Sequence, residues 1–366
     1  MKIKNQLFIA LLSTILLNAC KKDDTEKLLA PSIKMSAEGP ALTSKVNETT
    51  TLKAGNVLGN HIDQEWKVNG EVKSNTGVLE FTAPKSGIYT IDFTARNAAG
   101  VFIFQYLLQV AVPEVPVSAT SNKFVTTLFE YAPAAGQFMN EASWGNEQSG
   151  NAIVGKQANP GVCLGAFGGY VVYGFDHTVI NKAEDDIILY GNAFANFSEP
   201  GVVWVMQDEN GNGKPDDIWF ELSGSEFGKE GYIRNYAVTY TRPTPPSLSV
   251  AWRDNKGGSG IVKQSFHRLN HYPLWIIADE FTRTGTLLPS SGVKGSVSAT
   301  LDFGYADNKA GGDKVDIANA IDSDGKKVVL KGIDFIKVQT GIMADLTFSG
   351  ELSTEITGIA DLSLVK

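Results

Sequence analysis

Apolar and polar residues alternate with a period of two along much of the chain after residue 30. Residues 65–70 place Trp66 and Val68 on one face before an Asn-Gly turn, and residues 87–97 alternate large apolar with polar or small side chains. This period is typical of a strand with one buried face. An Asn97–Gly100 turn then leads into the apolar run 101–112. The pattern predicts a β-sandwich over residues 31–113.

Short apolar runs also continue through the remainder of the chain. They are residues 170–175, 187–191, 202–206, 236–240, 297–303, 328–330 and 335–338. No stretch keeps a 3.6-residue period over about 12 residues, so no helix of ordinary length is predicted. Alternating prolines at 113 and 116 indicate a stiff linker. The fold prediction is therefore all-β, with a larger, jelly-roll-like β-sandwich at 118–366 after the first sandwich.

The first 20 residues indicate export. Lys2 and Lys4 precede the apolar run 7–17, which is too short to span a membrane, and Leu-Asn-Ala-Cys follows at 17–20. This segment resembles a bacterial lipobox. The resemblance implies a signal peptide at 1–19, a diacylglycerol on Cys20, a lipidated tether at 20–30 and attachment to the membrane through lipid. The alternative is a secretory signal with an incidental cysteine.

Two acidic residues follow two lysines at positions 21–24. The arrangement resembles the surface-export tags that follow the lipidated cysteine in one large group of Gram-negative bacteria. It implies an outer-membrane protein exposed at the cell surface. A solvated tether is the alternative, because charged residues suit that position in any case.

Two family resemblances extend over the rest of the chain. The Trp66 strand, Pro84–Tyr89 and the Asn97–Gly100 turn resemble a PKD-type, immunoglobulin-like module, which implies a spacer or interaction domain. Residues 168–177, 190–194, 198–201 and later stretches such as 302–308 and 332–338 resemble a family of bacterial surface lipoproteins described as "cell surface protein". That resemblance implies a role in nutrient uptake, with a glycan, a corrinoid or another nutrient as ligand and an outer-membrane transporter as partner.

Composition removes several classes of protein. Hydrophobic residues make up 43% of the 366 residues, which suits a folded chain, and the net charge of −8 gives no electrostatic footprint for nucleic acid. Two cysteines make neither a disulfide scaffold nor a Cys-x-x-Cys zinc motif. With Cys20 lipidated, Cys163 is expected to be a lone, buried thiol in a strand.

The sharpest chemical motif lies at residues 208–217. Oxygen donors stand at relative positions 1, 3, 5, 7 and 9 of an EF-hand-like loop, with glycine at position 6; they are Asp208, Asn210, Asn212, the Lys214 carbonyl and Asp216. The motif predicts structural calcium. Position 12 is Trp219 instead of the usual glutamate, and a polar hairpin is the alternative. The six aspartates between 302 and 324 could hold a second ion, but solvated loop acids are the favoured alternative.

Signatures of catalysis are sparse. There is no Gly-x-Ser-x-Gly elbow and no phosphate-binding loop. Glu199, Asp217 and Glu221 could supply the carboxylate pair of a polysaccharide hydrolase, but sequence gives no separation between them. We therefore expect no enzyme activity, and the hydrolase stays an alternative.

Aromatic residues favour binding over catalysis, because rigid rings stack on sugars and other rings. Trp144 and Trp252 have polar neighbours and are the candidate exposed ligand-binding residues. The leading hypothesis is a surface-anchored, non-enzymatic protein that captures a glycan or cofactor. An accessory subunit of an outer-membrane transporter is a further alternative.

Overall fold

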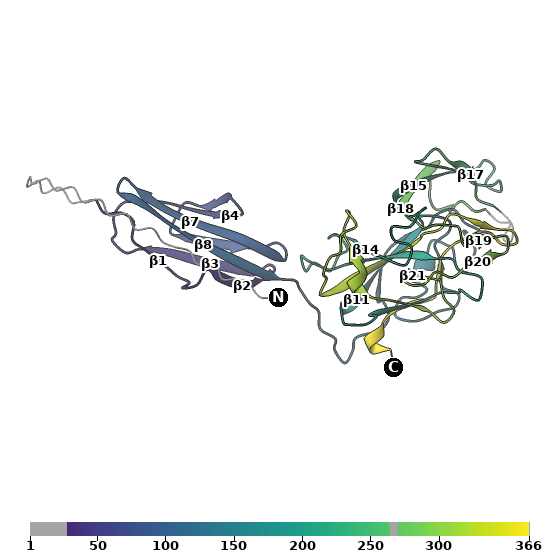
Figure 1. Ribbon diagram of the computed structural model, residues 1–366, viewed down its shortest axis with the longest axis horizontal. Helices are drawn as coiled ribbons and strands as arrows, with labels where there is room; N and C mark the ends of the chain where they lie inside the picture. The colour runs from purple at the N-terminus through teal and green to yellow at the C-terminus, as the bar shows by residue number, and fades with distance from the viewer. Residues whose placement is uncertain (1–27, 264–269, 366) are drawn as a thin grey trace, which may run out of the picture. The chain divides into compact units, whose positions relative to one another are not determined.

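The structure is a computed structural model that describes residues 28–263 and 270–365 (Figure 1). The chain is all-β, as predicted. Helical turns occur in the described ranges as three short 3-10 segments, Ser149–Asn151, Ile317–Asn319 and Leu362–Leu364. None of the helices in these ranges has the length and hydropathy needed to cross a bilayer. The expected lipidation site, Cys20, lies outside the described residues.

The chain divides into two compact units, and each strand pairs within its own group, β1–β8 or β9–β28. The first group forms two sheets. One has the order β1 (Ile33–Met35), β3 (Thr49–Asn56), β6 (Val78–Thr82). The other has the order β2 (Ala41–Lys45), β8 (Gly100–Ala111), β7 (Gly87–Asn97), β4 (Asp63–Val68), β5 (Glu71–Ser74).

Trp66 lies at the centre of the first sandwich. Its side chain is fully buried, and its ring centroid is 4.6 Å from that of Phe93 on β7. The indole Nε1 donates a hydrogen bond of 3.1 Å to the Thr76 carbonyl, so the one polar atom of the ring is satisfied. Val68 is buried on the same face of β4, which confirms the predicted register of this strand.

The second unit is built on a seven-stranded antiparallel sheet. Its order is β23 (Ala320–Ile321), β14 (Phe220–Leu222), β13 (Gly201–Met206), β24 (Gly332–Thr340), β11 (Tyr170–Ile180), β9 (Thr127–Ala132), and β21 (Tyr305–Ala306) also pairs with β13. A three-stranded sheet has the order β22 (Asp313–Val315), β12 (Ile187–Tyr190), β28 (Gly358–Asp361).

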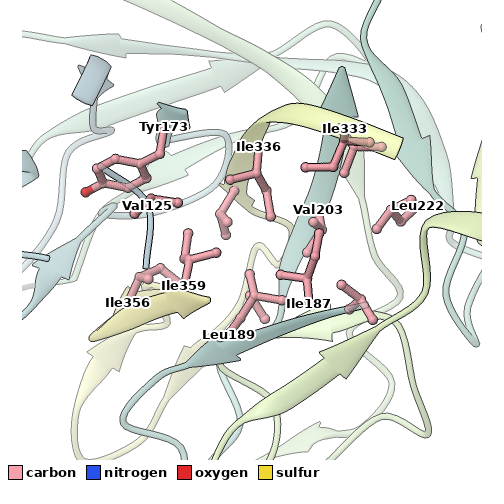
Figure 2. Packing of buried hydrophobic residues seen from close by; sticks show 14 of the residues in the cluster. Val125, Tyr173, Ile187, Leu189, Val203, Leu222, Ile333, Ile336, Ile356 and Ile359 are labelled. Atoms are coloured by element: carbon pink, nitrogen blue, oxygen red, sulfur yellow. The ribbon is translucent and has the colours of Figure 1, made fainter. Parts of the chain in front are cut away.

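The main core of the second unit lies between these two sheets (Figure 2). Ile187 and Leu189 of β12 meet Val203 of β13 and Ile333 and Ile336 of β24, and all five are fully buried. Because side chains of a strand alternate between its faces, Ile336 and Val338 of β24 share this core, as do Val203 and Val205 of β13, and the residue between each pair faces the opposite side of the sheet. The larger β-sandwich is therefore confirmed.

Several strands add to this sandwich. A four-stranded sheet has the order β17 (Ser259–Ile261), β16 (Ala251–Asp254), β15 (Ile233–Thr241), β18 (Glu280–Leu287). Two-stranded pairs are β10 (Val162–Cys163) with β27 (Glu355–Ile356), β19 (Val293–Lys294) with β20 (Val297–Ser298), and β25 (Asp345–Leu346) with β26 (Gly350–Glu351).

One predicted strand is wrong and another is largely wrong. The run 297–303 is a strand only at Val297–Ser298, and 328–330 has no strand. Leu330 is nevertheless buried in the main core, and Leu301 packs against a smaller cluster around Tyr305. Their apolar character reflects burial of loop residues, which periodicity does not separate from a short strand.

Candidate functional site

A cavity of about 360 Å³ in the second unit combines aromatic rings with uncommitted polar groups. Its walls come from five strands, β13, β14, β15, β18 and β24, and from the segment that precedes β14. The residues that matter chemically are Trp204, Trp219, Arg234, Lys337 and Gln339. They bring two cations, two indole rings and an amide together in one hollow.

The alternation of β24 places Lys337 in this cavity. Ile336 and Val338 point into the main core, so Lys337 and Gln339 must face the other side of the sheet. The same rule applies to β13, where Val203 points to the core and Trp204 lines the cavity. The packing of the core therefore fixes the side of the sheet to which the cavity residues belong.

Lys337 is a desolvated cation held among aromatic rings. Its Nζ lies 4.6 Å from the ring centroid of Trp204 and 5.1 Å from that of Trp219. It forms no ion pair with any carboxylate of the described chain. Burial lowers the pKa of Lys337 to about 8, and the charges of Glu130 and Glu221 oppose this shift.

Two further polar atoms beside Lys337 have no partner. Trp204 Nε1 and Gln339 Oε1 are buried without a hydrogen bond in the described part of the chain. The amide of Gln339 is fixed, because its Nε2 donates to the carbonyl oxygens of Gly168 at 3.0 Å and Thr284 at 2.9 Å. A free donor and a free acceptor, each in a cavity wall, are groups that a ligand can satisfy.

Arg234 and Glu221 form a fixed part of the same region. The Arg234 guanidinium donates to the carbonyls of Asp322 and Ser323 at 2.9 and 3.0 Å. Its Nε lies 3.7 Å from Glu221 Oε2. Glu221 also accepts a 2.6 Å bond from Thr286 Oγ1, and burial raises its pKa. Arg234 is therefore already bonded to groups of the protein, whereas Lys337 has no ion-pair partner among the described residues and is available to a ligand.

Glycine is required on β18 beside this amide. A Cβ placed on Gly285 would lie 1.7 Å from Gln339 Oε1, well inside any tolerated contact. Any larger residue would displace the amide or the strand. The close approach of β18 to β24 thus depends on the absence of a side chain at position 285.

The structure places the two predicted tryptophans elsewhere. Trp252 is half-buried and lines a separate cavity of about 240 Å³ with Tyr240 and Met343. Trp144 is also half-buried, and its ring centroid lies 6.1 Å from that of Phe138. Neither is an exposed ring. Polar sequence neighbours were a poor guide to exposure, because turn residues can flank a ring that packs inward.

The five predicted calcium ligands do meet in one loop. The two carboxylate oxygens of Asp208 accept hydrogen bonds from the backbone N–H groups of Asn212 at 3.1 Å and Gly213 at 2.7 Å. The side-chain amides of Asn210 and Asn212 donate to Asp216. The Lys214 carbonyl accepts a 2.9 Å bond from the N–H of Asp216. To bind calcium, the side-chain amides of Asn210 and Asn212 would have to rotate so that their oxygens, in place of their nitrogens, face the ion.

We expect one calcium ion to bind at this loop. Its removal should lower the melting temperature of the second unit, since an ion at 100 times its dissociation constant adds about 2.7 kcal/mol to the free energy of unfolding. Calorimetric titration of Asp208→Ala should show one fewer calcium equivalent than the wild type. Asp324→Ala, which changes an exposed acid in another turn, is the control. Equal stoichiometry in Asp208→Ala and wild type would make the loop a polar hairpin.

The three carboxylates considered for hydrolysis take separate places. Asp217 accepts hydrogen bonds from the backbone of Glu209 and Asn210 in the loop, and Glu221 is bound to Thr286. Glu199 is buried and instead meets Asp307 and Glu355.

The aspartates between 302 and 324 do not form one cluster. Asp313, Asp316 and Asp322 each accept backbone N–H groups in their own turns. Of the six, Asp307 alone belongs to a carboxylate group found among the described residues.

Sequence analysis missed Lys337, although a signal was present. Residues 335–338 form a short apolar run in a strand that is otherwise buried there, and Lys337 is a cation within it. A lysine in such a strand must either be paired or face a cavity. Gln339 follows Lys337 on the same face of β24, but Trp204 could not be connected with either, because strand pairing decides which strands are neighbours.

Comparisons with known proteins give distant structural matches. No family model matches the chain, and no curated protein matches it in sequence. A quinonprotein alcohol dehydrogenase-like protein from Bacteroides thetaiotaomicron is 11% identical with a TM-score of 0.21; the match covers 29% of this chain and 23% of that one. A SusE-like protein is 8% identical with a TM-score of 0.19, covering 91% and 98%.

The CBM51-2 and INT domains of Clostridium perfringens ZmpB are 10% identical with a TM-score of 0.16, covering 90% of this chain and 48% of that one. The chain spans about a quarter of the alcohol dehydrogenase-like protein and about half of the ZmpB fragment. TM-scores at this level carry no functional argument, so the function must be argued from the cavity itself.

Proposed function

We propose that the protein is a surface-anchored lipoprotein whose second unit binds an anionic glycan in the Lys337 cavity. The observation that carries the proposal is an unpaired lysine ammonium between the rings of Trp204 and Trp219. Burial of an unpaired cation is costly, and a ligand carboxylate or sulfate would supply the missing counter-charge.

The remaining groups of the cavity suit a sugar. Its volume of about 360 Å³ lies in the range of small-molecule sites. Indole rings offer apolar faces on which the C–H faces of a pyranose can pack. The free acceptor of Gln339 and the free donor of Trp204 match the hydroxyl groups that surround such a ring.

The rest of the chain would hold the binding unit at the cell surface. Cys20 would carry the lipid anchor in the outer membrane, and the immunoglobulin-like unit would act as a spacer between anchor and binding unit. Delivery of the captured nutrient to an outer-membrane transporter would follow, with this protein as its accessory subunit. These roles rest on the resemblances stated for residues 17–24 and 31–113.

We expect Trp219→Ala to weaken binding of tri-galacturonate by about thirtyfold, the effect of about 2 kcal/mol that loss of a buried aromatic anchor produces. Intrinsic tryptophan fluorescence and calorimetry would measure it. The methyl ester of the same trisaccharide should bind more weakly to the wild type, because it lacks the charge. Trp252→Ala, in the other cavity, is the matched control and should bind as the wild type does.

The lysine also sets a pH dependence. Because the pKa of Lys337 is about 8 in the free protein, affinity for the acid should fall as pH rises above 8, and affinity for the methyl ester should not. The wild type and Trp219→Ala would be compared across a panel of uronate, sialylated, sulfated and neutral glycans. The proposal would be refuted if the wild type bound the acid and its methyl ester equally, or if the two proteins bound every glycan of the panel equally. Cyanocobalamin in the same panel tests the corrinoid alternative, and release of shorter sugars would support the hydrolase.

A further inference from the structure

A third cavity of the same unit, distinct also from the one lined by Trp252, contains an unusual concentration of buried acid. It has a volume of about 240 Å³, and its polar lining comes from Gln137, Asn192, Glu199, Ser349 and Glu355. Four phenylalanines line it as well; they are Phe138, Phe194, Phe197 and Phe348. It is distinct from the Lys337 cavity, with which it shares no lining residue.

Three carboxylates meet beside this cavity, and two of them, Glu199 and Glu355, line it. Glu199 precedes β13, Asp307 follows β21 and Glu355 belongs to β27, and one carboxylate oxygen of each lies within 4.8 Å of the other two. All three side chains are buried. The described part of the chain contributes no lysine, arginine or histidine that forms an ion pair with any of them.

Backbone hydrogen bonds hold the carboxylates in place. Glu199 Oε1 accepts a 2.9 Å bond from the N–H of Ser353. Asp307 accepts bonds of 2.8 and 2.9 Å from the N–H groups of Asn192 and Ala193, and a 2.8 Å bond from that of Glu355. A Cβ at position 191 would lie 2.2 Å from Asp307 Oδ1, so Gly191 is needed for this approach. Main-chain N–H groups therefore hold the carboxylates of Glu199 and Asp307 in position.

Unsatisfied acceptors beside the acids point to a missing ligand. Gln137 is only 4% exposed and its Oε1 has no hydrogen-bond partner, while its Nε2 donates to the Glu351 carbonyl. Glu355 is 1% exposed and its Oε2 has no partner, and the same is true of Ser349 Oγ at 7% exposure. Each atom belongs to a residue that lines the cavity. Every one of these atoms can accept, so a cation would satisfy them together.

We propose that this cavity binds a hard divalent cation, calcium by its donor set, through Glu199, Asp307, Glu355 and the Gln137 side-chain oxygen. Oxygen ligands select calcium or magnesium over softer metals. Three carboxylates and an amide leave two or more positions of a calcium shell for water, which a cavity of about 240 Å³ can hold. Magnesium keeps most of its own waters and is less suited to so many protein ligands.

A neighbouring thiol does not change the donor set. Cys163 is buried, as the sequence predicted, and its Sγ donates to Ser353 Oγ at 3.4 Å. Burial and the charge of Glu355 raise the pKa of this thiol well above its usual range. The sulfur is therefore neutral, and a thiolate is what soft metals require.

Shared protons are the competing explanation. Burial raises the pKa of Glu199, Asp307 and Glu355, as expected when like charges gather out of water. Protons would relieve the repulsion between the acids. They would not satisfy Gln137 Oε1, however, unless a proton faced it, whereas a cation attracts every oxygen of the cavity. The two explanations differ in their response to added metal.

The test uses the full chain with Asp208→Ala, so that the 208–216 loop does not contribute. After chelation, calcium should bind at one equivalent per chain by calorimetry and raise the melting temperature of the second unit. Manganese as a paramagnetic probe should compete with it, and magnesium should be weaker. Glu355→Gln, added to the Asp208→Ala chain, should abolish binding of this calcium ion. In the absence of metal the double variant should melt no lower than the Asp208→Ala chain, because the substitution removes one of three repelling charges.

Asp186→Asn is the matched control, since it neutralises another buried carboxylate of the same unit and should keep the calcium equivalent. If neither calcium nor manganese shifts the melting temperature of the Asp208→Ala chain, the cluster is a proton-sharing group and the proposal fails. It also fails if Glu355→Gln still binds one equivalent. Glycan binding by the Lys337 cavity is unaffected by either outcome, so the two proposals stand or fall separately.

Discussion

Lys337→Met is expected to make the second unit more stable, by about 2–3 kcal/mol at pH 7, while it removes the preference for acidic ligands. The cation is held in the folded state at a pKa of about 8 instead of 10.5. Each unit of difference between the pKa in the folded and in the unfolded chain corresponds to about 1.4 kcal/mol of unfolding free energy. Loss of the cation–π contacts with Trp204 and Trp219 offsets part of the gain in stability. Methionine fills similar volume without a charge. Opposite effects on stability and binding are typical of a residue retained for function.

The pH dependence identifies the cause. Below pH 8 the lysine is charged in both the folded and the unfolded chain, so the stability difference between variant and wild type is constant. Between pH 8 and about 10.5 the unfolded wild type binds more protons than the folded one, so the wild type gains stability as pH rises and the difference disappears. Urea unfolding at pH 7, 9 and 10 would measure this. Lys331→Met, an exposed change next to β24, is the control, and an equal effect of both variants would contradict the assignment.

Trp66→Ala should unfold the first unit and leave the melting transition of the second unit in place. Removal of a fully buried tryptophan costs about 3–5 kcal/mol, which is a large part of the stability of a small domain. Scanning calorimetry should show the loss or a strong downward shift of one of two transitions. Trp66→Phe keeps the ring against Phe93 and loses mainly the bond to Thr76, so about 1–2 kcal/mol is expected.

Fragments 31–113 and 118–366 provide the independent check of the same prediction. Each should melt at the temperature of the corresponding transition in the full chain, because each has its own sheets and buried core. A downward shift of both transitions by Trp66→Ala would contradict this independence. So would aggregation of either fragment.

The sequence correctly predicted features that depend on a single strand, such as which residues face the core. Trp66 and Val68 were placed on the buried face of β4 by alternation, and the central part of β24 was recognised from its apolar run. It was uninformative where burial comes from loops, as at 297–303. The candidate site could not be predicted for a related reason. Lys337 and Gln339 lie on one face of β24, but Trp204 becomes their neighbour only through the pairing of β13 with β24.

The acidic cavity shows the same limit more strongly. Its carboxylates come from positions 199, 307 and 355, and no local motif connects them. The candidate calcium loop at 208–216 was recognisable as a motif because all of its donors lie within nine residues. Composition had already indicated an excess of acid. Only the structure shows that three of these acids are buried together, and that of the six aspartates between 302 and 324 Asp307 alone belongs to this group.

The position of β28 has a consequence for the order of folding. Gly358–Asp361 pairs with β12, and Ile359 packs in the main core against residues some 170 positions earlier in the chain. The core of the second unit therefore cannot close until β28 is available, whereas the first sandwich needs only the chain up to residue 111. Contacts between such distant positions slow folding. A chain of this protein that emerges with its N-terminal end first thus passes through a state with one finished domain followed by a long, exposed apolar segment, the kind of intermediate on which chaperones act.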